Sequence, residues 1–434
     1  MNNKMKNICL TVVFLVIILG FFVINLIAKD KEISESERRK LEVFPKISFS
    51  KILSGTFSDT FEKYGADQFA FRNTFRTIKT NFHLNILNQK DSDGYFMEDN
   101  IIYKNNYPLN EKSVINVTNQ IKDIKESYLN ETNNIYYTII PDKSYFLGDS
   151  SDYLKIDYEK LENIMNDNLK DIKYIELFDT LTIDDYYKTD THWKQENLLN
   201  VAEKLGKEMN FYVDTDYTIE SKGEFYGVYY GQMALGGDHD ELKCINNEEI
   251  NNAKVYEINN SEAKTVYNEE GLDSMDKYNF YLYGSVPLLK IENDLSKEDK
   301  KLIIFRDSFG SSLTPLLISG YKEIYIVDTR YISKKLLKDY INFENSDILF
   351  AYSTLLINDS STLKWIIKKE LNMDKRLEII KENCPQNHKC PAVSVCPVGA
   401  LSQNEFEAPK IDYNKCIRCG KCSNFCPKKA LVLK

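Results

Sequence analysis

The stretch KLIIFRDSFGSSLTPLLISGYKEIYIVD at residues 301–328 decides the fold, because strand-like and helix-like hydrophobic patterns alternate along it. The runs KLIIF (301–305) and EIYIVD (323–328) are typical of buried strands. Between them, SFGSSLTPLLISG (308–320) predicts a helix that ends at Gly320. The stretch therefore predicts two strands joined by a helix.

The same alternation continues on both sides of this stretch. Downstream, ISKKLLKDYINF (332–343) predicts a second helix and DILFAYS (347–353) a third strand. Upstream, NNIYYTII (133–140) is a β-rich run that ends at Pro141 and predicts another core strand. A strand–helix–strand–helix–strand unit predicts an α/β fold with a parallel sheet.

Ser308 follows the run KLIIF by three residues, at a predicted strand-to-helix turn. Functional side chains of parallel sheets gather at the carboxyl ends of the strands. We therefore expect the Ser308 hydroxyl at this edge of the sheet, with helix N-terminal N–H groups near enough to hold an oxyanion.

A serine nucleophile needs a base, and His192 is the candidate among four histidines. It lies in YYKTDTHWKQENLLNVAEKLGKEM (186–209), just before a predicted amphipathic helix. Asp190, two residues earlier, can accept the imidazole Nδ1–H and fix the tautomer. The structural alternative is that Asp190 or Thr191 caps the helix while His192 packs beside Trp193.

Several segments of the chain resemble the DHHW family, which is akin to the SGNH-type alginate O-acetylation proteins. The resemblance covers about residues 58–370. The segments that carry it are TDTHW (189–193), IIFRDSFGSSLTPLL (303–317), IYIVDTRY (324–331), KYGADQFAFRNTFRTIKT (63–80) and PDKSYF (141–146).

This resemblance implies an SGNH-like fold with Ser308 as nucleophile, His192 as base and Asp190 as orienting acid. Such proteins sit outside the membrane and act on acyl groups of polysaccharides, often served by a membrane-bound O-acyltransferase. The chain departs from the family at Thr191, where the family name implies a second histidine. It also has Arg306 where many esterases have glycine.

Charged residues near the predicted nucleophile are candidates for substrate binding. Arg306 and Arg330 stand at strand ends and could position a sugar or a carboxylate. An internal ion pair with Asp307 or Asp328 is the structural alternative. His239, in the loop GGDHDELKC, is more typical of an exposed loop histidine than of a cleft residue.

The N-terminal segment predicts a membrane anchor. Ile8 to Ala28 is 21 residues without a charge, which makes a helix about 31 Å long and matches a hydrocarbon core of about 30 Å. We expect an uncleaved signal anchor with a cytoplasmic N-terminus and the large domain outside. Residues 29–92 then form a helical linker, and residues 93–372 form the DHHW domain.

The C-terminal residues 373–434 predict a small α+β domain of the ferredoxin type. Cys416, Cys419, Cys422 and Cys426 follow the bacterial spacing C-x2-C-x2-C-x3-C-P, in which three thiolates hold one 4Fe-4S cluster and the fourth reaches another. By that pattern Cys396 completes the first cluster. A zinc site is the alternative reading of these cysteines.

The remaining cysteines of the tail suggest a second site. Cys384, Cys390 and Cys426 are left over, at unusual spacing. They could hold a second cluster, such as a three-iron one, or no cluster. We expect one 4Fe-4S cluster in the tail and leave the second open.

Composition bounds the function. The chain has 434 residues, 43% of them hydrophobic, and a formal net charge of −9. This predicts two or three folded domains, and it excludes a disordered polymer and disfavours nucleic acid as a partner. The prediction is a membrane-anchored O-acyltransferase or esterase for a cell-surface polysaccharide, fused to an iron–sulfur module with an unidentified redox partner.

The two ends of the chain imply different compartments. Iron–sulfur clusters are expected in the cytoplasm and the DHHW domain outside it. The chain could be two adjacent proteins read as one, a genuine fusion in an anaerobe, or a protein that lies wholly inside. A rival function is electron transfer by the tail, with the DHHW domain as a silent scaffold.

Overall fold

The computed structural model divides the chain into two compact units, Met1–Lys364 and Trp365–Lys434. The predicted domain boundary at residues 372/373 lies outside the described residues. In the first unit the structure describes residues 3–34, 36–148, 151–235, 238–258, 260–332 and 334–363; in the second it describes residues 376–386, 390–394, 396, 399–404, 407–413, 416, 422–423, 426 and 428–433.

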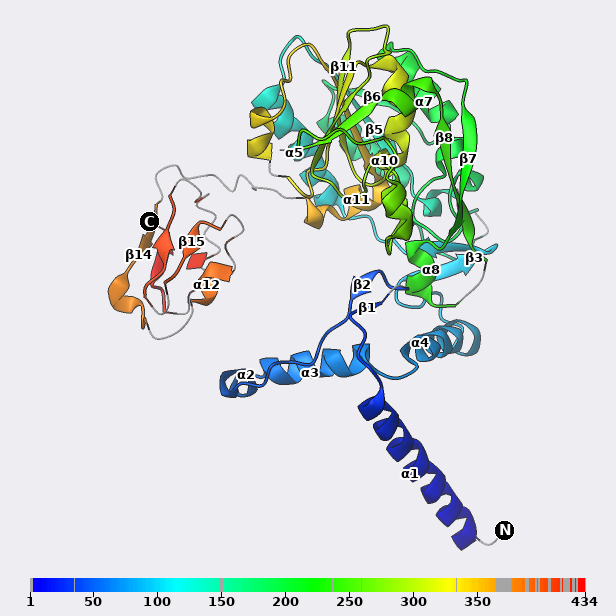
Figure 1. Ribbon diagram of the computed structural model, residues 1–434, viewed down its shortest axis with the longest axis vertical. Coiled ribbons are helices and arrows are strands. Elements are labelled where there is room, and N and C mark those ends of the chain that lie inside the picture. Colours follow the sequence, from blue (N-terminus) through cyan, green and yellow to red (C-terminus); the bar gives the residue numbers. More distant parts are fainter. Residues whose placement is uncertain are drawn as a thin grey trace. The chain divides into compact units, whose positions relative to one another are not determined.

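A seven-stranded sheet forms the centre of the first unit (Figure 1). Its strand order is β6-β5-β13-β11-β12-β10-β9. The first five strands run parallel, and β10 is antiparallel to both of its neighbours. The strands are β5 (Asn134–Ile140), β6 (Lys173–Ile175), β9 (Lys254–Glu257), β10 (Leu288–Glu292), β11 (Lys301–Arg306), β12 (Glu323–Val327) and β13 (Asp347–Ser353). The predicted α/β class and parallel sheet are confirmed.

Strand β11 is the buried strand that the sequence pattern predicts, and it lies at the centre of the strand order. Its residues 302–306 are all buried, and β12 and β13 pair with its two edges. A strand covered on both faces needs a continuous apolar run instead of an alternating one. The carboxyl end of β11 therefore opens at the middle of the sheet edge.

Two predicted helices differ in the structure. Residues 308–320 form a short helix α10 (Phe309–Leu313) followed by the 3-10 helix η7 (Thr314–Gly320). Pro315 lacks the N–H that an α-helix needs at this point. The helix predicted at 332–343 is shorter in the structure: its described residues form the 3-10 helix η8 (Lys334–Asp339) in place of a longer α-helix. The buried apolar residues of this segment do not keep the regular spacing of one helix face.

The remaining helices of this unit cover the sheet and the loops at its carboxyl edge. They are α5 (Glu111–Tyr128), α6 (Tyr158–Asn168), α7 (Leu199–Met209), α8 (Val228–Met233), α9 (Glu248–Asn252) and α11 (Thr354–Asn358). Two antiparallel ribbons, β3 (Tyr95–Glu98) with β4 (Ile101–Lys104) and β7 (Thr218–Phe225) with β8 (Asp240–Asn246), complete it. The amphipathic helix predicted after His192 is α7.

The N-terminal region begins with α1 (Asn3–Ile27), which is long and apolar enough to cross a membrane and has no buried residue. It is followed by the hairpin β1 (Ile33–Ser34) and β2 (Arg39–Lys40), and by α2 (Phe49–Leu53), α3 (Thr56–Asp67) and α4 (Arg72–Asn81). Helices α2, α3 and α4 lie within the helical linker predicted at residues 29–92. Phe21 of α1 stacks against Phe69 and lies beside Phe75.

The second unit is a small α+β domain. Its described elements are the antiparallel pairs β14 (Leu377–Ile379) with β17 (Leu431–Leu433) and β15 (Leu401–Ser402) with β16 (Lys410–Ile411), and the short helix α12 (Pro391–Ser394). Its core contains few large apolar side chains, and Cys422 is one of the buried residues in it.

Candidate functional site

Ser308 stands at the turn from β11 into α10. It is the N-cap residue of α10, but its side chain does not cap the helix. The neighbouring Asp307 caps the helix instead, because its carboxylate accepts the N–H of Phe309 at 3.1 Å. The same carboxylate accepts the N–H of Ser353 at 2.8 Å. Asp307 thus ties the turn to the end of β13 and leaves the Ser308 hydroxyl to face another partner.

That partner is His192. The distance from His192 Nε2 to Ser308 Oγ is 2.7 Å, and the distance from His192 Nδ1 to Asp190 Oδ1 is 2.6 Å. A carboxylate accepts the Nδ1–H, so Nε2 is the unprotonated nitrogen that accepts the Ser308 hydroxyl proton. The structure brings the three residues together in the geometry of a Ser-His-Asp triad. The alternative in which His192 only packs beside Trp193 does not account for this contact.

Asp190 is fully buried and remains a carboxylate because of its partners. Burial alone would raise its pKa, but the charge and hydrogen bond of His192, the charge of Arg38 and the Val228 N–H together hold that pKa well below its usual range. The Val228 N–H, at the start of α8, donates to Asp190 Oδ2 at 2.7 Å. A charged Asp190 can stabilise the imidazolium that forms during catalysis.

The loop that carries His192 is fixed to α10 by neighbouring side chains. Trp193 Nε1 donates to the Phe309 carbonyl at 3.1 Å and to Ser312 Oγ at 2.9 Å. The ring of Tyr278 stacks on the imidazole of His192 with centroids 3.8 Å apart and planes 8° apart. These contacts hold the base and the nucleophile at a fixed separation, which general-base catalysis requires.

Asp240 holds the two residues of this loop that come just before Asp190. Its carboxylate accepts the backbone N–H of Lys188, at 2.8 Å, and both the N–H, at 2.8 Å, and the hydroxyl, at 2.6 Å, of Thr189. The adjacent His239 is exposed and lies 3.5 Å from Glu224. Its placement fits the expectation of an exposed loop histidine.

Lys143 is a buried lysine that contacts the loop leading to Asp190. Its Nζ donates to the carbonyl oxygens of Tyr187, at 3.1 Å, and Lys188, at 3.2 Å, and lies 4.9 Å above the ring of Tyr229. Burial lowers the pKa of Lys143 to about 7, although Asp190 and nearby carboxylates oppose the shift. Lys143 therefore supports the loop that leads to Asp190.

This lowered pKa predicts a pH dependence of stability. In the unfolded chain a lysine titrates near 10.5, so between about pH 7 and pH 10 the unfolded state binds more protons and stability rises with pH. We expect Lys143→Met to lose this contribution, about 1.4 kcal/mol per pH unit. The Tm of the full-length protein in detergent, recorded from pH 6 to 10, should rise less steeply in Lys143→Met than in the wild type. Parallel curves of Tm against pH for the wild type and Lys143→Met would contradict this prediction. An equally reduced slope in Lys46→Met, a change at an exposed lysine, would contradict it as well.

Arg306 and Arg330 both belong to an internal ion pair with Asp328. Arg306 is buried, with Nη1 3.4 Å from Asp328 Oδ2 and Nη2 donating to the Gly284 carbonyl at 3.0 Å. Arg330 makes two hydrogen bonds to the same carboxylate, at 2.9 and 2.7 Å, and keeps 19% of its side chain exposed. Substrate binding by either arginine stays a prediction, and only Arg330 offers exposed surface for it.

The cysteines of the tail gather around its core. Among the described residues, Cys390, Cys396, Cys416 and Cys426 pack against the core that contains buried Cys422. Backbone N–H groups donate to two of the sulfurs, Ala400 to Cys396 Sγ at 3.2 Å and Ala430 to Cys426 Sγ at 3.3 Å. Cys419, the remaining predicted ligand of the first cluster, lies outside the described residues.

The cysteines predicted for a second cluster share one cavity. Cys384, Cys390 and Cys426 line an apolar cavity of about 120 Å³ together with Ala392 and Leu431. Within the described part of the chain, no three His, Cys, Asp or Glu side chains converge on a point where a single ion would bind. A zinc ion needs four ligands about 2.0–2.3 Å away. A second cluster held by these three cysteines stays a prediction.

Solved structures show the fold of the first unit. A DHHW family protein from Eubacterium siraeum DSM 15702 is 20% identical, with a TM-score of 0.52, and the match covers 63% of this chain and 94% of that one. Bacillus cereus PatB1, in a structure with a sulfonyl adduct, is 19% identical, with a TM-score of 0.50, over 61% of this chain and 95% of that one. The middle of the chain therefore has the fold of these proteins.

Sequence comparison identifies the tail. Residues 409–432 match the family model described as a 4Fe-4S binding domain. No curated protein matches the chain. The match covers the motif that begins at Cys416, so an iron–sulfur module at the C-terminus is confirmed, and the number of its clusters stays a prediction.

Proposed function

From a middle domain with the DHHW fold and a 4Fe-4S tail, we propose that the chain is a membrane-anchored O-acyltransferase or esterase for a cell-surface polysaccharide. The observation that supports it is the continuous chain of contacts from Asp190 through His192 to Ser308, at 2.6 and 2.7 Å. Both distances lie within the hydrogen-bond reach that a nucleophile and its base need.

In the proposed reaction, Ser308 attacks the carbonyl of an acyl ester while His192 Nε2 takes the hydroxyl proton. The Ser308 N–H is the donor that we assign to the oxyanion of the tetrahedral intermediate. His192 then gives the proton to the leaving oxygen, the ester C–O bond of the donor breaks, and an acyl-serine remains. A sugar hydroxyl or water, deprotonated in turn by His192, takes the acyl group and frees Ser308.

We place this domain next to the outer face of a membrane. Helix α1 is the one span found among the described residues, and the contacts of Phe21 with Phe69 and Phe75 bring the following segment against it. Large apolar side chains between residues 43 and 87 are exposed, as expected beside lipid. A membrane-bound O-acyltransferase that delivers the acyl group is the partner we propose.

For the tail we propose two iron–sulfur sites. Cys396, Cys416, Cys419 and Cys422 hold a 4Fe-4S cluster, and Cys384, Cys390 and Cys426 hold a second one around the cavity that they line. Such clusters carry single electrons, and N–H groups aimed at the sulfurs tune their potential. If the triad proves inactive, electron transfer by this tail is the remaining function.

The test is to trap the serine. The full-length protein in detergent, treated with phenylmethylsulfonyl fluoride, is expected to carry one sulfonyl group on Ser308, found by peptide mass spectrometry, and to lose its hydrolysis of p-nitrophenyl acetate. A sugar oligomer added to the untreated enzyme should divert acetyl groups from water if transfer is the reaction. An enzyme that is neither labelled nor active would leave the domain as a scaffold.

A further inference from the structure

The hairpin of β1 and β2, which follows the membrane helix, reaches the triad. Arg38 lies just before β2 with a left-handed backbone, φ 52°, and its side chain is 10% exposed. Arg38 Nη1 lies 3.7 Å from Asp190 Oδ2 and 2.7 Å from Asp276 Oδ1, and Nη2 donates to the Tyr226 carbonyl. One guanidinium therefore faces two carboxylates, one of which is the acid of the triad.

Both carboxylates contact or support the histidine. Asp190 accepts the Nδ1–H of His192. Asp276 accepts the N–H of Tyr278 at 3.1 Å, and the ring of Tyr278 stacks on the same imidazole. Burial raises the pKa of Asp276, an effect that the positive charge of Arg38 opposes. Without a cation between them, the buried carboxylate of Asp190 and the partly exposed carboxylate of Asp276 would repel each other and lose their fixed positions.

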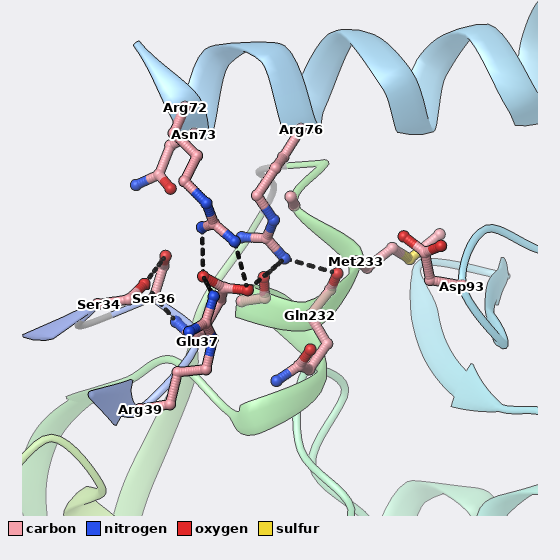
Figure 2. Close-up of polar contacts among 12 residues, drawn as sticks. Ser34, Ser36, Glu37, Arg39, Arg72, Asn73, Arg76, Asp93, Gln232 and Met233 are labelled. Carbon is pink, nitrogen blue, oxygen red and sulfur yellow. Dashed lines mark hydrogen bonds and ion pairs between the residues drawn. The ribbon is translucent and has the colours of Figure 1, made fainter. Parts of the chain in front are cut away.

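A second set of ion pairs holds the hairpin in place. Figure 2 shows Arg72 and Arg76 directed from α4 towards Glu37, the residue before Arg38. Arg72 forms a bidentate pair with Glu37, and Arg76 Nη2 lies 3.8 Å from it. Arg76 also donates to the carbonyl oxygens of Gly231, at 2.9 Å, and Gln232, at 3.1 Å. Helix α4 thus joins the hairpin to α8.

The hairpin also packs closely on α8 itself. A Cβ atom at Gly231 would lie 1.5 Å from the Ser36 carbonyl oxygen, so only glycine fits there. Helix α8 begins with Val228, whose N–H donates to Asp190. The hairpin therefore touches Asp190 by two routes, directly through Arg38 and through the helix on which it packs.

We propose that Arg38 is a positioning residue of the triad, so that the membrane-proximal hairpin completes the active site. This inference rests on the proposed function of Ser308, His192 and Asp190. Arg38 acts through Asp190 and Asp276 and does not touch the reacting atoms. Its consequence is that activity depends on the segment that connects the domain to its membrane anchor.

The experiment compares Arg38→Ala, Arg38→Lys and the control Lys40→Ala in the full-length protein. Lys40 belongs to the same hairpin, and its side chain is exposed. With p-nitrophenyl acetate as substrate, Arg38→Ala should lower kcat about 10–100-fold, the usual effect of losing a group that orients a site residue, and change KM little. Arg38→Lys and added guanidinium should each restore part of kcat, and Lys40→Ala should match the wild type.

Each outcome separates this inference from the proposed function. If the wild type neither turns over the ester nor labels at Ser308, the proposed function fails. If the wild type is active and Arg38→Ala keeps its kcat, the positioning role is overturned. It is also overturned if Arg38→Ala loses kcat together with its Tm and neither lysine nor guanidinium restores activity, because that pattern describes a structural residue.

Discussion

Replacing Ser308 by alanine is expected to abolish catalysis, lowering kcat for p-nitrophenyl acetate by about 10⁴–10⁶-fold. The hydroxyl that His192 Nε2 contacts at 2.7 Å is the only group removed. Because no acyl-serine can form, labelling by phenylmethylsulfonyl fluoride should disappear as well. The fold should be unaffected, since the Ser308 side chain does not cap α10. The measurements are the steady-state rate, the mass of the labelled peptide and the Tm.

Ser311 provides the matched control for this prediction. It lies on the same helix, and its buried hydroxyl has no hydrogen-bond partner among the described residues. Ser311→Ala should therefore keep both activity and labelling, and a buried hydroxyl without a partner costs little to remove. Residual activity of Ser308→Ala near that of Ser311→Ala would exclude Ser308 as the nucleophile.

The sheet could be predicted because its strands are long apolar runs. KLIIF and DILFAYS are buried on both faces and contain almost only apolar residues, so their sequences alone distinguish them from surface segments. The helix predicted at 332–343 forms only in part, as η8, because the buried apolar residues of this segment do not keep the spacing of one helix face. Local pattern predicts elements whose burial is regular, and it fails where tertiary packing decides which side chains are buried.

The triad could be predicted from its motifs, but its supporting residues could not. Asp190 and His192 are neighbours in sequence, and Ser308 follows a recognisable strand. Arg38 lies in the turn of the β1–β2 hairpin, Tyr278 in a short 3-10 helix and Asp240 at the start of β8. No local motif links them to the triad, and each meets the triad loop only after the chain folds. Asp240 stands next to His239, which the sequence analysis considered and set aside, and nothing in the sequence marks Asp240 as a support of the triad loop. The sequence-based alternative for Arg306, an internal ion pair with Asp328, is where the structure places that residue.

The tail contains the same short sequence motif twice, which bears on the number of clusters. The sequence CP-x-x-A-L occurs at residues 396–401 and 426–431. In both copies the residue before the alanine has a left-handed backbone, Gly399 with φ 59° and Lys429 with φ 51°. In both, the alanine N–H donates to the cysteine sulfur. A turn built twice to aim an N–H at a sulfur supports a thiolate ligand in each half.

Replacing Cys422 by serine is expected to remove all the iron of the tail, because loss of the first 4Fe-4S cluster also unfolds the domain that would hold the second. Cys390 lines the tail cavity together with Cys384 and Cys426. Cys390→Ser should remove the iron of the second cluster and leave the first cluster in place. Two measurements follow the iron content of each variant after anaerobic purification. One is iron analysis, and the other is the visible absorbance of the clusters, which dithionite bleaches. The control is Cys244→Ser, since Cys244 is a buried cysteine of the first unit and should not affect iron content.

Cys422→Ser should unfold the tail, because the described part of its core has few large apolar side chains. The described core of the second unit has Leu377, Leu401 and Leu431 as its large buried side chains, and a domain this small rarely folds on so little apolar area without a metal or a disulfide. Cluster binding then supplies folding free energy directly. Limited proteolysis of Cys422→Ser should release the first unit intact while the tail is degraded. If iron stays at the wild-type level after Cys390→Ser and falls to zero after Cys422→Ser, the tail holds one cluster only, and the cavity lined by Cys384, Cys390 and Cys426 is not a ligand site.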